Sequence, residues 1–256
     1  MSHPQYGQLR PVTPYASVLL ARNPSPMTLD GTNTWLLRAP GSGSCLVIDP
    51  GPDDPDHLRA VVAAAGEVTG ILLTHGHLDH SAGAAALRAL TRAPVRALDP
   101  AQRLGGEGLG EGDVVAAAGV EVLVLATPGH TADSLCFAVG DAVLTGDTVL
   151  GRGTTVVAHP DGRLADYLDS LRRLQELGTR AVLPGHGPEL PDLAAVTSAY
   201  LAHREERLEQ VRAALEQLGP DASAMDVVRV VYADVDPVLW PAAELSVRAQ
   251  LEYLRR

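Results

Sequence analysis

The chain has 256 residues, of which 46% are hydrophobic and 20% are charged, a balance typical of a folded globular protein. Its net charge is −11, and every basic residue is an arginine. The absence of lysine excludes a Walker A phosphate loop and a lysine Schiff base. The acidic balance also argues against tight non-specific binding of nucleic acid, which needs many phosphate contacts.

Sequence features that direct a protein to a membrane or out of the cell are not apparent. No apolar stretch approaches the roughly 20 residues that span a bilayer. The start, MSHPQYGQLRPV, lacks the basic and apolar regions of a signal peptide. Cys45 and Cys136 lie in apolar runs, which favours buried thiols over a disulfide framework. We therefore expect a cytoplasmic protein with no membrane partner.

The first 190 residues alternate short apolar runs, bounded by Gly, Pro or Asp, with a few stretches of helical periodicity. Predicted strands cover residues 17–20, 33–39, 44–49, 70–75, 121–127, 134–140, 142–147 and 180–185. Predicted helices cover residues 55–65, 79–91 and 163–177, and the Gly-rich stretch 105–112 is interpreted as a turn before a strand. This mixture predicts an α/β (α+β) sandwich with helices outside paired sheets.

The pattern becomes entirely helical after Pro191. Residues 193–218 carry one apolar face and end at Gly219-Pro220, and two shorter helices are expected at 225–232 and 241–256. We predict a catalytic domain at 1–190 and a small all-helical appendage at 191–256. His203 and Arg204 are expected on the solvated face of the long helix. Its apolar face can serve a homodimer or pack on its own domain.

The segment Thr74-His75-Gly76-His77-Leu78-Asp79-His80 is the central motif of the chain. It joins a predicted strand to a predicted helix, so it occupies a loop that can direct several side chains into one cavity. A lone histidine is more often a core or surface residue than a ligand. Three histidines and an aspartate within six residues, beside a flexible glycine, instead indicate a ligand cluster.

Three later loops repeat the arrangement of an apolar run that ends in a turn with one ligand-type residue. They contain His130, Asp147 and His186. Each turn alone is weak evidence, because a Gly-Asp turn is usually only a turn. Together the four loops favour a catalytic site for zinc, with iron or manganese as alternatives, because they offer imidazole and carboxylate without thiolate. Seven ligands exceed one tetrahedral site and suit two adjacent metals bridged by Asp147.

The motifs THGHLDH, PGHT, TGD and PGHGP, in this order and spacing, resemble those of the metallo-β-lactamase superfamily. The resemblance implies a four-layer αββα sandwich with the metals at one edge of the sheets. It assigns His75, His77 and His130 to the first metal, Asp79, His80 and His186 to the second, and Asp147 to both. It also implies that Asp49, with Thr74, supports the ligand loop from behind.

A narrower resemblance links the chain to the lactamase-beta-2-like branch of that superfamily. It is carried by GTNTWLL (31–37), GDTVLGRGTTVV (146–157), PGHGPEL (184–190) and AHREERLEQV (202–211). The resemblance implies a winged-helix-like tail, and the best-known member of the branch cleaves single-stranded RNA. Asn33, Thr154 and Thr155 are candidate substrate contacts, although each residue serves a turn equally well. His159 lies near this segment and is expected at the surface.

The leading hypothesis is a metal-dependent hydrolase that uses a metal-bridging hydroxide, with Asp79, His130 and Asp147 as its catalytic residues. No GxSxG elbow is present, and none is required. Single-stranded RNA fits the narrower resemblance, whereas small-molecule thioesters or lactones, as in glyoxalase II-like enzymes, suit an acidic protein better. β-Lactam hydrolysis is disfavoured because no secretion signal is seen. A mononuclear iron persulfide dioxygenase and a non-catalytic binding protein are the remaining alternatives.

Overall fold

The computed structural model describes residues 5–255, so the end of the predicted helix 241–256 and the first four residues of the chain lie outside it. Its internal contacts divide the chain into two compact units. The sandwich unit comprises the chain up to residue 126 together with residues 133–153 and 180–191. The helical unit comprises residues 127–132, 154–179 and the chain from residue 192 onward.

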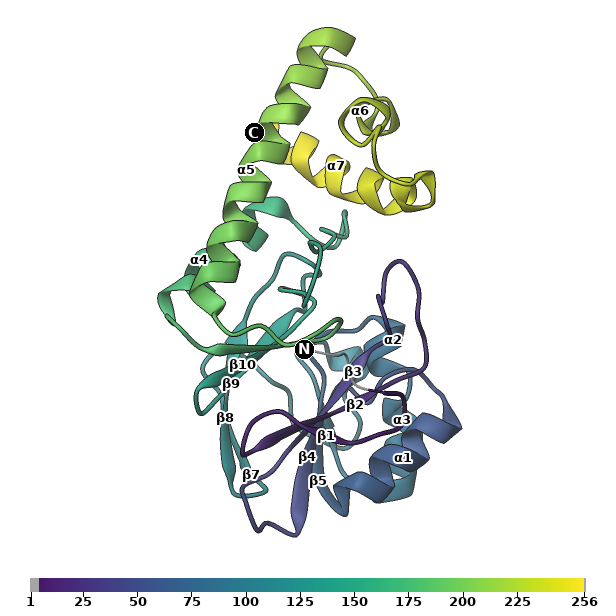
Figure 1. The fold of residues 1–256 in the computed structure, drawn as a ribbon, viewed down its shortest axis with the longest axis vertical. Helices are drawn as coiled ribbons and strands as arrows, with labels where there is room; N and C mark the ends of the chain where they lie inside the picture. The colour runs from purple at the N-terminus through teal and green to yellow at the C-terminus, as the bar shows by residue number, and fades with distance from the viewer. Residues whose placement is uncertain (1–4, 256) are drawn as a thin grey trace. The chain divides into compact units, whose positions relative to one another are not determined.

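The first sheet of the sandwich unit contains six strands in chain order (Figure 1). Its pairs are antiparallel up to β4, whereas β4–β5 and β5–β6 are parallel. The strands are β1 (Arg10–Pro11), β2 (Ala16–Leu20), β3 (Asn33–Leu37), β4 (Ser44–Ile48), β5 (Glu67–Leu72) and β6 (Val95–Arg96). The short strands β1 and β6 were not predicted, because two paired residues leave no readable alternation.

The second sheet has five strands in the order β11-β10-β9-β8-β7. Only its β10–β11 pair is parallel. The strands are β7 (Val114–Ala117), β8 (Val120–Ala126), β9 (Leu135–Val139), β10 (Ala142–Gly146) and β11 (Ala181–Pro184). Strand β7, which follows the predicted Gly-rich turn, also went unpredicted.

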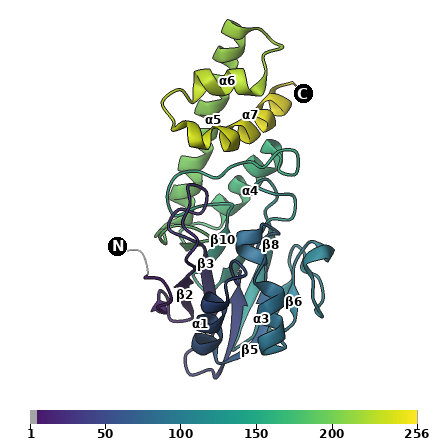
Figure 2. The same ribbon diagram turned by 90° about the vertical axis from the view of Figure 1, so that its right-hand side faces the viewer.

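Both faces of the first sheet are covered, because alternate side chains of a strand point to opposite faces. Trp35 and Leu37 of β3 enter a core that includes Phe137 and Leu144 of the second sheet. Leu36, between them, enters a second core with α1 (Pro55–Ala65) and α3 (Ala84–Thr91). Figure 2 shows these two helices beside the sheet. Cys45 and Cys136 are buried free thiols in β4 and β9, as expected from their apolar surroundings.

The ends of the parallel strands determine where the polar loops emerge. Strands β4 and β5 share one edge for their carboxyl ends, as do β10 and β11. Asp49 follows β4, the His75 loop follows β5, Asp147 follows β10 and His186 lies just after β11. Ligand sites in α/β sheets typically form at such carboxyl ends.

The helix predicted at 79–91 is broken into two in the structure. A single turn, α2 (Leu78–Ser81), precedes α3. The backbone N–H of Gly83 donates to the carbonyl of Gly51, 2.9 Å away, instead of continuing the helical ladder. A methyl group at Gly83 would lie 2.9 Å from the Pro52 carbonyl oxygen, so this close approach requires glycine. The break keeps the ligand-bearing turn separate from α3.

The helical unit contains α4 (Leu164–Glu176), α5 (Leu193–Leu218), α6 (Ala224–Val231) and α7 (Trp240–Leu254). It also contains a short 3₁₀ turn at Pro237–Leu239, and a second such turn lies at Pro100–Gln102 in the sandwich unit. The bounds of α5 match the prediction because Asp192 caps its first turn and Gly219 ends it. The core of the helical unit contains Val211 of α5, Val227 of α6 and Val247 of α7. Helix α4 and the His130 turn cluster with this unit, so the division is not a single cut near residue 190.

These elements confirm the predicted fold class of two mixed sheets with helices and a helical C-terminal region. In the range 5–255, no helix is both long enough and apolar enough to cross a membrane.

Candidate metal centre

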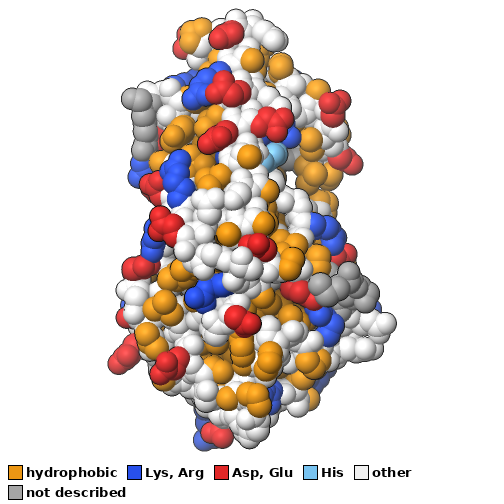
Figure 3. Space-filling view, turned by 60° about the vertical axis from the view of Figure 1, so that its left-hand side comes forward, with side chains coloured by type: hydrophobic (Ala, Val, Ile, Leu, Met, Phe, Trp, Pro, Cys, Tyr) orange, Lys and Arg blue, Asp and Glu red, His pale blue; other side chains and the backbone are white. Residues whose placement is uncertain are grey.

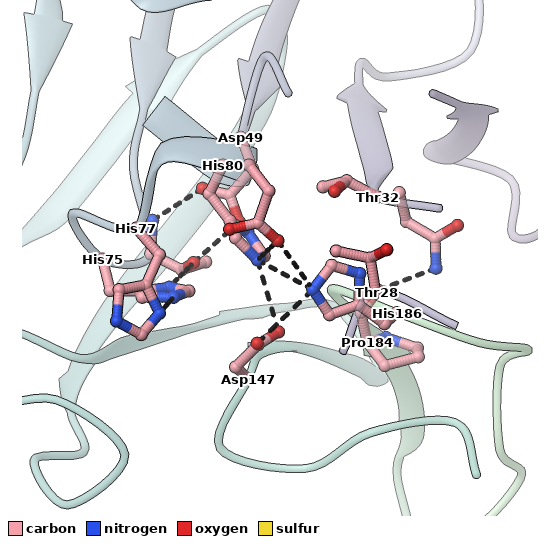
Figure 4. A network of polar contacts seen from close by, with 12 residues as sticks. Thr28, Thr32, Asp49, His75, His77, His80, Asp147, Pro184 and His186 are labelled. Carbon is pink, nitrogen blue, oxygen red and sulfur yellow. Dashed lines mark hydrogen bonds and ion pairs between the residues drawn. The ribbon is translucent and has the colours of Figure 1, made fainter. Parts of the chain in front are cut away.

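Four side chains from three loops converge at the carboxyl edge of the sheets (Figure 4). His80 Nε2 lies 3.2 Å from His186 Nε2 and 3.4 Å from Asp79 Oδ2. The two carboxylate oxygens of Asp147 lie apart: Oδ1 is 3.4 Å from His80 Nε2 and Oδ2 is 3.4 Å from His186 Nε2. Asp147 therefore spans the two imidazoles.

The two remaining histidines of the central motif stand beside this group. His75 Nε2 lies 3.1 Å from His77 Nδ1, and the His75 and His80 rings are 4.3 Å apart between centroids. Ligand-type atoms of His75, His80 and Asp147 all lie within 4.8 Å of one another. The same holds for Asp79, His80 and His186. The two groups overlap at His80.

In His75, His80 and His186, the protein holds the ring nitrogen that faces away from this cluster. His80 Nδ1 lies 2.8 Å from Asp49 Oδ2, and His186 Nδ1 donates to the Gly31 carbonyl at 3.1 Å. Thr74 donates its hydroxyl to Asp49 Oδ2 at 2.7 Å, so the same hydroxyl accepts from His75 Nδ1 at 3.0 Å. Such bonds leave the opposite nitrogens as acceptors for a metal. The donor set thus fits divalent metal ions.

The cluster is electrostatically coupled. Burial opposes protonation of His186, but the neighbouring Asp147 carboxylate outweighs it and raises the pKa of His186 to about 9. The pKa of His80 is likewise raised well above its ordinary value against the effect of burial, chiefly by Asp147 and Asp49. Burial favours the neutral form of Asp147, yet His186 and His80 hold the pKa of that carboxyl well below its usual range. Asp147 is therefore ionised at neutral pH and keeps His80 and His186 protonated, and a metal ion would bind in place of those protons.

The turn that carries His186 is strapped to β3 by Asn33. The Asn33 side-chain amide donates to the carbonyls of Pro184 at 3.0 Å and Gly187 at 2.9 Å, and its backbone N–H donates to Gly185 at 2.8 Å. Asn33 is 2% exposed. Sequence reasoning offered Asn33 as a substrate contact, whereas its amide protons are used here to hold a ligand turn. A single side chain that bonds to distant backbone carbonyls leaves no periodic pattern in the sequence.

Glycine is needed between β11 and His186. A methyl group at Gly185 would lie 2.7 Å from both Asp147 Oδ1 and His80 Cε1. Sequence reasoning treated this glycine only as part of the PGHGP motif. The structure shows that its missing side chain makes room for the cluster.

The other predicted site residues belong to the helical unit. His130 is buried, and its Nδ1 donates to the Val156 carbonyl at 2.7 Å, which leaves Nε2 as the acceptor. Thr154 is exposed, whereas Thr155 is buried and its carbonyl accepts from Arg204. His159 is partly exposed and lies 3.3 Å from Glu252 through Nε2.

Comparisons with known proteins identify the family of the chain. The model of the metallo-β-lactamase superfamily matches residues 27–186, and that of the β-lactamase-associated winged helix domain matches residues 223–256. A β-lactamase-like protein 2 homolog from Drosophila melanogaster is 32% identical over 260 residues, covering 93% of this chain and 87% of that protein. An atrochrysone carboxyl ACP thioesterase from Aspergillus fumigatus is 34% identical over 231 residues, covering 85% and 70%.

A solved β-lactamase domain protein from Burkholderia ambifaria superposes with a TM-score of 0.82 at 24% identity, covering 99% of this chain and 89% of that one. The likeness at this identity concerns the fold. Two mixed sheets with a histidine and aspartate cluster at one edge define a hydrolase of the metallo-β-lactamase fold. The chain belongs to the metallo-β-lactamase superfamily, with the associated winged helix domain at its C-terminal end.

Proposed function

We propose that the protein is a two-metal hydrolase that cleaves a thioester of a small acyl compound. The observation that carries the proposal is the placement of Asp147 between His80 and His186, with Asp79 Oδ2 3.1 Å from His186 Nε2. The fungal relative named as an acyl carrier thioesterase supports the choice of bond.

The ligand assignment follows the motifs and the cluster. His75, His77 and His130 would hold the first metal, Asp79, His80 and His186 the second, and Asp147 both, with Asp49 and Thr74 fixing the rings from behind. We propose zinc for both positions, because imidazole and carboxylate ligands suit it, and iron or manganese is the alternative. When bound, such a pair supplies a strong nucleophile near neutral pH and polarises the substrate oxygen.

The protein side chains would then orient the attacking water and carry its proton. Burial raises the pKa of Asp79, but the hydrogen bond from His186 and the charge of His80 outweigh it, and the net shift is downward. Asp79 is thus a carboxylate that can accept the proton as the water oxygen bonds to the acyl carbon. The carbon–sulfur bond breaks and the thiolate leaves. A thiol with a pKa of about 8.5 needs little help to leave, so that proton can return to solvent or to the thiolate.

Cleavage of single-stranded RNA is a second candidate, favoured by the winged helix match over residues 223–256. The charge of the helical unit supports it less well. Arg172, Arg212 and Arg229 each lie within 2.8 Å of an acidic residue three positions earlier. On the face shown in Figure 3, acidic and basic side chains are interspersed and form no patch of one sign. Binding of a polyanion relies on such a patch.

The test compares zinc-loaded wild type with Asp79→Asn on two substrates at the same salt concentration. The substrates are acyl thioesters of N-acetylcysteamine of graded chain length and a labelled single-stranded RNA. Asp169→Asn, which alters an exposed carboxylate on α4, is the matched control. We expect thioester hydrolysis that falls at least about 100-fold in Asp79→Asn and stays unchanged in the control. RNA cleavage with that same dependence, and no thioester hydrolysis, would overturn the choice of substrate.

A further inference from the structure

The segment 154–158 belongs to the helical unit and contacts the His130 turn, α5 and α7. Arg204 of α5 donates to the Thr155 carbonyl, and the next carbonyl, that of Val156, accepts from His130 Nδ1 at 2.7 Å. The Val157 N–H donates to the hydroxyl of Ser246 of α7 at 3.2 Å. The Ala158 N–H donates back to the His130 carbonyl at 3.0 Å.

The His130 turn is also packed against α4. A methyl group at Gly129 would lie 2.3 Å from Tyr167 Cα, so the turn requires glycine at this position. Ser170 donates its hydroxyl to the Pro128 carbonyl at 2.8 Å. The guanidinium of Arg204 in turn stacks on the Tyr167 ring at 5.2 Å from its centroid. Arg204, Tyr167 and the His130 turn therefore form one continuous packed group.

Arg204 was expected on a solvated face, and that expectation is wrong. It is 3% exposed and lies in the buried stripe of α5, between Tyr200 and Leu208. Sequence periodicity misled because an arginine in an apolar stripe is usually assigned to the adjacent polar face.

The environment of Arg204 is unfavourable for a charge. Among residues 5–255, no carboxylate lies within ion-pair distance of its guanidinium, and its Nε has no hydrogen-bond partner. A buried cation without a paired acid destabilises a fold unless other contacts offset it. The Thr155 carbonyl and the Tyr167 ring are the contacts that do so here. An apolar residue of similar length would fill this stripe without that penalty, so packing alone does not explain arginine.

We propose that Arg204, assisted by Ser246, is a positioning residue for the first metal. It holds the 154–158 segment so that the Val156 carbonyl keeps the proton of His130 on Nδ1 and the lone pair of Nε2 toward the metal. The helical unit thereby fixes which nitrogen of His130 is available to a metal. The inference rests on the proposed role of His130 as a ligand. A carbonyl behind a ligand histidine typically contributes 10–100-fold to metal affinity.

The experiment measures metal affinity by chelator competition on the full chain, with cobalt in place of zinc so that its visible spectrum reports the ligand set. The variants are Arg204→Met, Arg204→Lys, Ser246→Ala and His130→Ala. Arg212→Met, which removes an exposed arginine of the same helix, is the control. Thermal unfolding of each metal-free protein separates loss of fold from loss of metal.

We expect Arg204→Met to weaken the first of the two metals about 10–100-fold and to change the cobalt spectrum in the same direction as His130→Ala, with the second metal retained. Arg204→Lys should restore part of the affinity, because an ammonium can still donate to the Thr155 carbonyl. Arg212→Met should match the wild type. If Arg204→Met does not fold, the test rests on Ser246→Ala. We expect this variant to lose less affinity than Arg204→Met would, and only for the first metal.

The outcomes separate two failures. Unchanged metal affinity in His130→Ala would refute the ligand set of the proposed function. Weakened affinity in His130→Ala with wild-type affinity in both Arg204→Met and Ser246→Ala would refute the positioning role alone. Equal weakening of both metals in Arg204→Met would also contradict it, since a general structural role predicts that result.

Discussion

Asp49 Oδ2 lies 2.8 Å from His80 Nδ1, and both side chains are almost completely buried. The same carboxylate accepts from the Thr74 hydroxyl at 2.7 Å and, through Oδ1, from the Thr74 backbone N–H at 2.8 Å. One carboxylate thus fixes the ring of His80 and the loop that begins the ligand motif. It couples the end of β4 to the end of β5.

Replacement of Asp49 by Asn should loosen His80 without removing any metal ligand. The amide cannot carry the negative charge that favours the bond to His80 Nδ1. We expect metal affinity to fall about 10–100-fold, with a matching loss of activity at limiting metal. Chelator competition measures the affinity, and Asp53→Asn on the neighbouring surface loop is the control. Wild-type affinity in Asp49→Asn would show that the support is dispensable.

Asn33→Ala should free the turn that carries His186. The substitution removes the side-chain donor of the Gly187 carbonyl, whereas the Pro184 carbonyl keeps the indole N–H of Trp35. We expect a loss of about 1–3 kcal/mol in the free energy of unfolding of the metal-free protein. Urea denaturation measures it, and metal affinity should fall in parallel. Stability within 0.5 kcal/mol of wild type, taken as about the spread of neutral substitutions, would contradict the strap.

Gly185→Ala tests the space beside the cluster. The added methyl group would meet Asp147 Oδ1 and His80 Cε1 at 2.7 Å, so the bridging carboxylate must shift. We expect loss of at least one metal equivalent and an activity decrease of more than about 100-fold. A shift of about 1 Å in a catalytic group has an effect of this size. Elemental analysis of the purified variant checks it. Gly43→Ala is the control, because the added methyl group meets no atom within 4 Å there and φ is not positive.

A buried histidine outside the cluster should make the protein sensitive to acid. Burial is the main cause that lowers the pKa of His57 below its ordinary value, although Asp54 opposes the shift. Its Nε2 lies 2.9 Å from the Thr34 hydroxyl, and the ring also has a hydrogen bond to the backbone of Pro50. With Nδ1 as the donor to Pro50, Nε2 can accept from Thr34 only while the ring is neutral. The folded state therefore binds fewer protons than the unfolded state.

The stability that His57 contributes is present above the unfolded pKa near 6.5 and is lost as the pH falls below it. His80 and His186 of the metal-free cluster have raised pKa values and act in the opposite sense, so the contribution of His57 is read from the difference between wild type and His57→Gln. We expect the free energy of unfolding of the wild type, relative to that of His57→Gln, to fall between pH 7 and 5. Urea titrations at each pH measure both. His159→Gln, at a partly exposed site, should keep the wild-type slope. An identical slope in His57→Gln would rule out this origin.

Sequence reasoning located the long helices and the central strands because their periodicity spans several turns or pleats. Helix α5 was predicted at its observed bounds, since its apolar face is continuous and Gly219-Pro220 marks its end; the cap at Asp192 was found only in the structure. The prediction of one continuous helix at 79–91 was wrong. The hydrogen bond from Gly83 to Gly51 interrupts the helix, and it joins segments that are far apart in the chain. Contacts of this kind have no local signature.

The candidate site divides in the same way. Spacing alone grouped His75, His77, Asp79 and His80 in the sequence. The loops of Asp147 and His186 were grouped with them only by their repeated motif, and the structure brings them together because the parallel strands before them share their carboxyl edges. The second role of Asn33 and the burial of Arg204 were missed. Both residues donate hydrogen bonds to backbone carbonyls. Every residue has a backbone carbonyl, so the sequence does not indicate which carbonyl will be the acceptor.

The central claim is that two metals, held by this cluster, carry out the hydrolysis. The direct test titrates zinc into metal-free protein and follows bound metal and thioester turnover in the same samples. The account predicts that turnover rises until two equivalents per chain are bound, and that Asp147→Asn neither binds the second equivalent tightly nor turns over substrate. Full turnover at one equivalent, unchanged by Asp147→Asn, would contradict it.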